Sequence, residues 1–168
     1  MRKPVIGVMG GGESASAEDC NLAYRLGALI AEEGWVLLNG GRNIGVMDAS
    51  ARGARAKGGL TVGILPDAGT EHASRYIDIA VATGMGGARN VINVLSSNII
   101  VAVSGKAGTI SEIALALKYK KPVILLNFDV HMLFQVYSGE GFLHQAQSAE
   151  EAIRLIRDLL ARAPNPAS

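Results

Sequence analysis

The chain has 168 residues and a formal net charge of +1; 49% of its residues are hydrophobic and 18% are charged. This length favours one domain with a sizeable core. With a net charge this close to zero, the protein has no overall electrostatic attraction for nucleic acid or for an anionic membrane surface. No apolar run approaches the roughly 20 residues that span a bilayer. The single cysteine, Cys20, allows no internal disulfide and is compatible with a reducing cytoplasm. We therefore expect a cytoplasmic protein that binds neither nucleic acid nor membrane.

Short apolar runs alternate along the chain with patterns of helical period. The first helix is expected to start at Ser16 and Asp19, which resemble a capping box, and to end near Gly34. The second helix is rich in alanine and glycine, which lets a helix pack closely. The expected strands, in chain order, cover residues 5–9, 35–38, 61–65, 77–82, 99–103 and 123–126.

The last third of the chain is less regular. Residues 127–144 carry no clear pattern, and we expect them to cover the site or to form a subunit contact. Residues 149–162 have apolar positions at helical spacing and predict a final helix. Residues 1–162 are expected to form one ligand-binding domain, and residues 163–168 a disordered tail.

Apolar strands that alternate with helices predict a mainly parallel sheet covered by helices on both faces. The expected fold is therefore α/β, a three-layer, doubly wound Rossmann-like fold, in which ligands bind outside the carboxyl ends of the strands.

Three glycine turns follow expected strands and therefore lie at that edge of the sheet. Glycine leaves no Cβ in the way of an anion, and the free N–H groups of a helix N-terminus bind phosphate. We expect the three turns to hold one phosphate-bearing ligand through Gly10, Gly11, Gly12, Glu13, Ser14, Gly40, Gly41, Arg42, Asn43, Gly45, Ser104, Gly105, Lys106, Ala107, Gly108 and Thr109.

The first turn, residues 10–15, also matches the dinucleotide-binding fingerprint G-x-G-x-x-G/A. The alternative is that it is a tight strand–helix turn that binds no ligand. The second strand ends in Asn39 where an acidic residue would bind the ribose of NAD, so NAD is not expected. A Walker A loop is absent because Ala107 follows Gly105-Lys106. The three histidines are far apart and match no metal spacing, so no protein-ligated metal is expected.

Two charged residues are candidates for chemistry. Arg89, followed by Asn90, opens a helix after a glycine pair, where a cation would neutralise phosphate. Glu112 has two interpretations that stay open: with Thr109 it fits a capping box, and it also fits a carboxylate that polarises water or binds a hydroxyl.

Several stretches resemble the Lonely Guy superfamily of cytokinin-activating phosphoribohydrolases. Residues 40–47 are similar to the family's GGGxxGLM segment, and 104–112 to its PGGxGTxxE motif, with Arg89 at the place of the family's essential arginine. The resemblance covers about residues 5–126 and implies a Rossmann-like fold that binds a phosphorylated nucleotide or pterin. Proteins of this superfamily are often labelled lysine decarboxylases, but nothing here resembles a pyridoxal-phosphate lysine site.

The departures from the enzymes' motifs favour another branch. The chain has Ser104-Gly105-Lys106 in place of Pro-Gly-Gly, and Ala88 stands where the enzymes carry a glutamate. The run Gly-x-x-Arg-Asn at 86–90 and the run Gly-Thr-x-Ser-Glu at 108–112 are closer to the molybdenum cofactor carrier proteins. That resemblance implies a homo-oligomer, a dimer or tetramer, that binds molybdopterin and meets molybdoenzymes or cofactor-synthesis proteins.

Two main functions remain open, and a nucleotide sensor without turnover is a weaker third option that the sequence does not separate from the first. The first is a carrier or storage protein for the molybdenum cofactor, whose phosphate and polar edge contact the glycine turns, Arg89 and Glu112. The alternative is a nucleoside 5′-monophosphate phosphoribohydrolase, in which Arg89 anchors the substrate and Glu112 directs water to the anomeric carbon.

Overall fold

A computed structural model describes residues 2–137 and 139–162; the predicted tail 163–168 lies outside this part of the chain. The strands are β1 (Val5–Met9), β2 (Val36–Asn39), β3 (Thr61–Leu65), β4 (Ile79–Ala82), β5 (Ile99–Ala102), β6 (Val123–Leu126) and β7 (Leu143–Ala146). The α-helices are α1 (Ala17–Glu32), α2 (Gly45–Ala56), α3 (Asn90–Ser96), α4 (Ala107–Lys118) and α5 (Ala149–Arg162), with 3-10 turns η1 (Gly86–Arg89) and η2 (His131–Tyr137).

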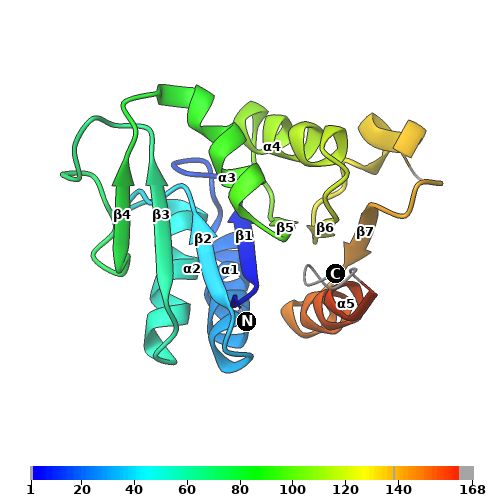
Figure 1. The fold of residues 1–168 in the computed structure, drawn as a ribbon, viewed down its shortest axis with the longest axis horizontal. Helices are drawn as coiled ribbons and strands as arrows, with labels where there is room; N and C mark the ends of the chain where they lie inside the picture. The colour runs from blue at the N-terminus through cyan, green and yellow to red at the C-terminus, as the bar shows by residue number, and fades with distance from the viewer. Residues whose placement is uncertain (1, 138, 163–168) are drawn as a thin grey trace.

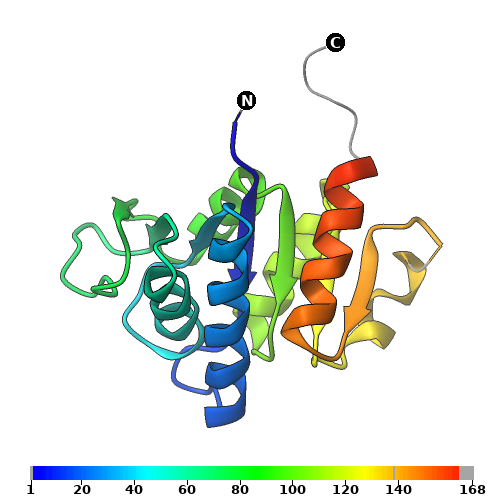
Figure 2. The ribbon, with the colours of Figure 1, turned by 90° about the horizontal axis from the view of Figure 1, so that it is seen from below.

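The strands form one seven-stranded sheet in the order β4-β3-β2-β1-β5-β6-β7, and each neighbouring pair is parallel. Helices cover both faces, with α1, α2 and α5 on one face and α3 and α4 on the other (Figures 1 and 2). This is the predicted three-layer, doubly wound Rossmann-like fold. Its sheet is fully parallel where the sequence predicted a mainly parallel one.

The two cores differ in size and lie on opposite faces of the sheet. Side chains of alternating strand residues, such as Ile6 and Val8 of β1, pack with α1, α2 and α5, whereas Met9 packs with α3 and α4. The central strands are buried because helices cover both of their faces, which explains the apolar runs in the sequence. β4 at the edge is the exception, since all four of its residues are exposed.

α1 and α2 cross with their backbones in contact. A Cβ on Gly27 would lie 2.1 Å from the Ser50 carbonyl oxygen, and one on Gly53 would lie 2.0 Å from that of Tyr24. The small residues predicted for α2 thus allow it to approach α1 as well as the sheet. At the start of α1, Ser16 and Asp19 form the predicted capping box.

Two elements of the region 127–144 were not predicted. η2 lies there, the edge strand β7 begins there at Leu143, and β7 pairs with β6. Three of the four β7 residues are partly or fully exposed, so the strand lacks the apolar run by which the buried strands are recognised.

Candidate functional site

The order of the strands places two glycine turns side by side. β1 lies between β2 and β5. Strands β2 to β4 are added in sequence on one side of β1 and strands β5 to β7 on the other, so the order of the strands reverses between β1 and β5. At this point the Gly11 N–H donates to the Ser104 carbonyl oxygen at 2.9 Å, which joins the turn after β1 to the turn after β5. Crevices at such a switch point are where open α/β sheets bind ligands.

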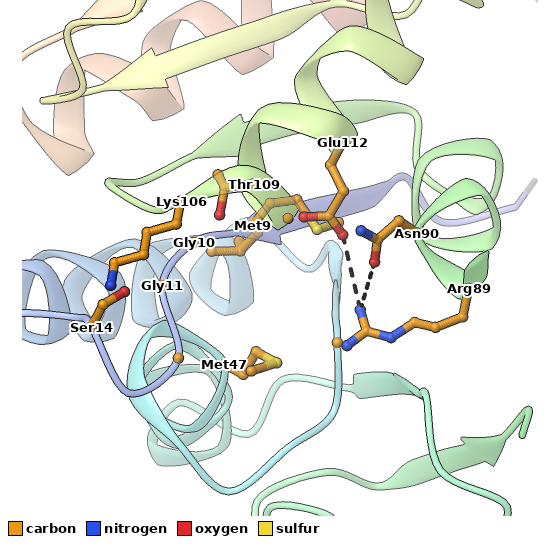
Figure 3. Close-up of a pocket in the computed structure, with 14 residues that line it drawn as sticks. Met9, Gly10, Gly11, Ser14, Met47, Arg89, Asn90, Lys106, Thr109 and Glu112 are labelled. Atoms are coloured by element: carbon orange, nitrogen blue, oxygen red, sulfur yellow. Dashed lines mark hydrogen bonds and ion pairs between the residues drawn. The ribbon is translucent and has the colours of Figure 1, made fainter. Parts of the chain in front are cut away.

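A cavity of about 190 Å³ opens at this edge. The turn after β1, the N-terminal part of α4 with its N-cap Lys106, and Arg89 and Asn90 at the end of η1 contribute to its lining, and Figure 3 shows the labelled side chains around it. Its lining residues are Val8, Met9, Gly10, Gly11, Gly12, Ser14, Gly40, Met47, Arg89, Asn90, Lys106, Gly108, Thr109 and Glu112.

The start of α2 supports the first glycine turn from outside the cavity. Gly45 has a φ of +57°, and a Cβ there would lie 2.3 Å from the Gly11 and Gly12 carbonyl oxygens. The next N–H, that of Val46, donates to the Gly11 carbonyl oxygen at 2.9 Å. This helix N-terminus therefore holds the turn after β1 through a backbone hydrogen bond.

The other wall is the first turn of α4. Lys106 is the N-cap residue and its side chain makes no capping hydrogen bond. Gly105 lies against Thr109, since a Cβ on Gly105 would be 2.0 Å from Thr109 Oγ1. The capping box predicted for Thr109 and Glu112 is wrong: the helix already begins at Ala107, and the Glu112 side chain turns towards α3 instead.

Glu112 is a buried carboxyl held by an amide. Asn93 Nδ2 donates to Glu112 Oε1 at 2.8 Å, and Arg89 Nη1 lies 3.9 Å from the same oxygen. Burial raises the pKa of Glu112 to about 7, although the hydrogen bond from Asn93 and the charge of Arg89 act to lower it. The group can therefore take up or release a proton near neutral pH, which is what a general acid or base requires.

Arg89 points into the cavity from the end of η1. Its side chain is 11% exposed and its Nη1 donates to Asn90 Oδ1 at 3.3 Å (Figure 3). The guanidinium lies against Gly40, where a Cβ would be 2.8 Å from both Nη1 and Nη2. Burial lowers the pKa of Arg89, while the Glu112 carboxylate raises it. A cation this close to glycine backbone can bind an anion directly.

Lys106 supplies a second cation at the opposite end of the cavity. Figure 3 shows its ammonium extended towards the Ser14 side chain, whereas Arg89 and Glu112 lie beyond Met9. The cavity therefore has a positive group at each end and glycine backbone between them.

The cavity brings together eleven of the predicted site residues and leaves eight outside its lining. Gly40 is the residue of the second glycine turn that lines it. Arg42 instead forms an ion pair with Asp67, and the Asn43 N–H donates to the His72 carbonyl oxygen. The residues outside the lining are Glu13, Gly41, Arg42, Asn43, Gly45, Ser104, Gly105 and Ala107.

Four residues of the site were not predicted from the sequence. Val8, Met9 and Met47 line the cavity, and Asn93 holds Glu112. Asn93 had a usable signal, because it interrupts an apolar helical run one turn after Arg89. Among the residues that the structure describes, no group of three or more His, Cys, Asp or Glu side chains could hold a metal ion. No helix within the described residues is long and apolar enough to cross a bilayer.

Comparisons with known proteins show the family and the fold to which the chain is similar. The family model SLOG cluster4 (LDcluster4) matches residues 3–153. The molybdenum cofactor binding protein from the phototrophic bacterium Rippkaea orientalis is 51% identical, with a TM-score of 0.90 over 95% of this chain and 99% of that one. The Moco carrier protein from Chlamydomonas reinhardtii is 44% identical, with a TM-score of 0.88 over 96% of this chain and 100% of that one.

A phosphoribohydrolase is a more distant relative. The cytokinin riboside 5′-monophosphate phosphoribohydrolase of Mycobacterium tuberculosis is 36% identical over 99 residues, which are 58% of this chain. The match spans about half, 53%, of that enzyme's length. With the family match over residues 3–153 and the close structural similarity to molybdenum cofactor carriers, the chain belongs to the SLOG cluster4 family.

Proposed function

We propose that the protein binds the molybdenum cofactor as a carrier or storage protein. The observation that carries the proposal is the cavity itself, with glycine backbone between two cations, Arg89 and Lys106. Molybdopterin has a phosphate and an anionic metal–dithiolene end, so a site with separated positive groups fits it. The similarity to the Rippkaea orientalis and Chlamydomonas reinhardtii proteins supports this ligand over other phosphorylated molecules.

The lining also fits the apolar part of such a ligand. The thioethers of Met9 and Met47 face the cavity between the two charged ends (Figure 3). Thioether sulfur is polarizable and packs favourably against ring systems. In this proposal Glu112 and Asn90 provide hydrogen bonds beside Arg89, while Gly11, Gly12 and Thr109 contact phosphate.

The proposal is tested with molybdenum cofactor released anaerobically from a purified molybdoenzyme. The protein is mixed with it, re-isolated by gel filtration, and assayed for molybdenum by mass spectrometry and for pterin by fluorescence after oxidation. Molybdenum and pterin that elute with the protein at a fixed ratio, and that still reconstitute an apo-molybdoenzyme after storage, support a carrier. Elution of all pterin in the small-molecule fractions would refute it.

The second candidate is a nucleoside 5′-monophosphate phosphoribohydrolase. One observation favours it: Glu112 has a pKa of about 7, is held by Asn93 and lies 3.9 Å from Arg89. Such a carboxyl can direct water to an anomeric carbon. Ala88 in place of a glutamate, and Ser104-Gly105-Lys106 in place of Pro-Gly-Gly, count against it.

Incubation with AMP and with an N6-alkylated AMP separates the two functions. Chromatography would show free base if the protein is the hydrolase, and Glu112→Ala should abolish its release. No free base from folded protein leaves cofactor binding as the function.

The assembly is a further part of the proposal. Six large apolar side chains on or next to η1, α3, the end of α4 and η2 are exposed: Met85, Leu95, Tyr119, Met132, Leu133 and Val136. We expect a homo-oligomer, a dimer or tetramer, that covers these side chains, with molybdoenzymes or cofactor-synthesis proteins as transient partners in the cytoplasm. Sedimentation at micromolar concentration measures the mass, and a monomer would contradict this expectation.

A further inference from the structure

Asp67 lies outside the cavity lining and has no role in the function proposed above. Its Oδ2 lies 3.5 Å from Arg42 Nε, and its side chain is 28% exposed. Within the described part of the chain, this same oxygen is buried and has no hydrogen-bond partner, and the same holds for Arg89 Nε. A buried carboxylate oxygen is costly unless positive charge compensates it, so the residue needs an explanation.

The backbone around Asp67 holds the segment that carries Arg89. The Gly84 N–H donates to the Asp67 carbonyl oxygen at 2.9 Å, and the Gly86 N–H donates to that of Pro66 at 3.0 Å. Just before them, Thr83 Oγ1 donates to the Leu65 carbonyl oxygen at 2.7 Å. These bonds fix residues 83–86 on the end of β3, and η1 starts at Gly86 and ends at Arg89.

Arg42 and Asp67 act on the pKa of Arg89 in opposite directions. Burial lowers the pKa of Arg89, Glu112 raises it, Arg42 lowers it and Asp67 raises it. The negative charge of Asp67 therefore offsets the effect of the Arg42 charge on Arg89. Arg42, which the sequence placed at the ligand, instead pairs with Asp67 outside the cavity lining.

We infer that the Asp67 side chain is a positioning group: its carboxylate holds Arg42, two residues after the Gly40 against which the Arg89 guanidinium lies, and so keeps Arg89 in place to meet the ligand's anionic group. The inference rests on the proposed binding function, because the consequence for affinity depends on an anionic ligand. It does not require Asp67 to touch the ligand.

Simple electrostatics and positioning predict opposite results when the carboxylate is removed. Asp67→Ala deletes a negative charge near an anion site, which by charge alone would tighten binding. If Asp67 positions Arg89, affinity for the molybdenum cofactor and for AMP should instead fall about tenfold, roughly one charge-assisted contact. Glu71→Ala is the matched control, because it removes the same charge from the same loop at an exposed position, and it should leave affinity unchanged. Asp67→Glu should restore part of the binding.

A double-mutant cycle shows whether the effect passes through Arg89. On an Arg89→Met background, Asp67→Ala should cause no further loss, since the group it positions is gone. Additive losses, or tighter binding by Asp67→Ala alone, would overturn the inference.

A readout without ligand keeps the inference separate from the proposed function. The side-chain Nε–H of Arg89 is buried, so its NMR signal, assigned by its absence in Arg89→Lys, should be protected from solvent exchange. Asp67→Ala should broaden or remove that signal and Glu71→Ala should preserve it. If wild-type protein binds neither probe, the proposed function fails and the NMR comparison still decides; an unchanged Arg89 signal in Asp67→Ala refutes the positioning role. Thermal unfolding confirms that each variant is folded.

Discussion

Asn93 and Glu112 are joined across two helices by a hydrogen bond of 2.8 Å, from Nδ2 on α3 to Oε1 on α4. Both residues are buried, Asn93 completely and Glu112 to 6% exposure. The bond fixes one carboxylate oxygen against α3, on the side from which Arg89 approaches at 3.9 Å.

Stability should depend on pH through Glu112. Burial raises its pKa in the folded state to about 7 from an ordinary 4.5, so the folded protein binds the proton more tightly than the unfolded chain. The contribution of Glu112 to the free energy of unfolding is therefore fully present below about pH 4.5 and is lost as the pH rises through about 7. The total loss should be up to about 3 kcal/mol. Glu112→Gln keeps an oxygen for Asn93 but cannot ionise, so its unfolding free energy should not show this fall. Urea denaturation of both proteins from pH 4.5 to 8 measures the difference; parallel curves would contradict it.

Removal of the Arg89 guanidinium should weaken ligand binding with little loss of stability. Arg89→Ala deletes a largely buried cation that lies against Gly40 at the cavity wall, so affinity for the molybdenum cofactor or AMP should fall about 10- to 100-fold. The free energy of unfolding should change by less than about 1 kcal/mol, because removal of the buried guanidinium also removes its desolvation cost and Glu112, whose pKa burial already raises to about 7, can take up a proton instead of staying as an unpaired charge. Calorimetry measures the affinity, with Arg154→Ala on the exposed side of α5 as the charge-matched control. Unchanged affinity would remove Arg89 from the site.

Gly105 and Gly108 should respond differently to alanine although they are three residues apart. A Cβ on Gly105 would lie 2.0 Å from Thr109 Oγ1 and 3.2 Å from the Gly11 nitrogen, so Gly105→Ala should displace Thr109 and disturb both walls. Nothing lies within 4 Å of a Cβ on Gly108. We expect Gly105→Ala to lose about 1–3 kcal/mol of stability and most of its ligand affinity, and Gly108→Ala to keep its stability. Thermal unfolding and calorimetry of the two variants decide; equal behaviour would show that the turn adjusts.

The contact between α1 and α2 should not tolerate a methyl group. Gly53→Ala places a Cβ 2.0 Å from the Tyr24 carbonyl oxygen, which belongs to backbone and cannot rotate away. The cost should be at least about 1–3 kcal/mol, measured by urea denaturation. Gly87→Ala is the control because its Cβ has nothing within 4 Å. A Gly53→Ala protein as stable as the control would mean that the helices separate easily.

The fold was predictable because its strands carry the strongest kind of signal. Buried parallel strands such as β1, β3 and β6 have apolar side chains on both faces, and their predicted limits match the structure. β7 escaped prediction because an edge strand with exposed side chains has no such run. The same reasoning predicted β4, whose residues are apolar in sequence yet exposed in the structure.

The site was predictable in part, because a sequence shows where glycines and charged residues stand but does not show in which direction a side chain points. Gly10 to Gly12, Lys106 and Glu112 meet as expected, since the turns after β1 and β5 are neighbours. The position of Arg42 outside the cavity lining depends on its pairing with Asp67, 25 residues later, and no local pattern encodes that pairing. The role of Asn93 likewise depends on the packing of α3 against α4.

The central place of β1 has a consequence for the growing polypeptide on the ribosome. Strands β1 to β4 pair in the order in which they are made, but one edge of β1 receives its partner only when β5 has emerged. Lys106 and Glu112 also come after β5, so a nascent chain that ends near residue 98 has four of the seven strands and contains Arg89 but lacks the other two charged groups of the site. Such stalled chains should be cut readily by protease, whereas chains that extend well past residue 126 should resist; early resistance would contradict this order. Until β5 has been synthesised, the unpaired edge of β1 is the part of the nascent chain that we expect a chaperone to protect from aggregation.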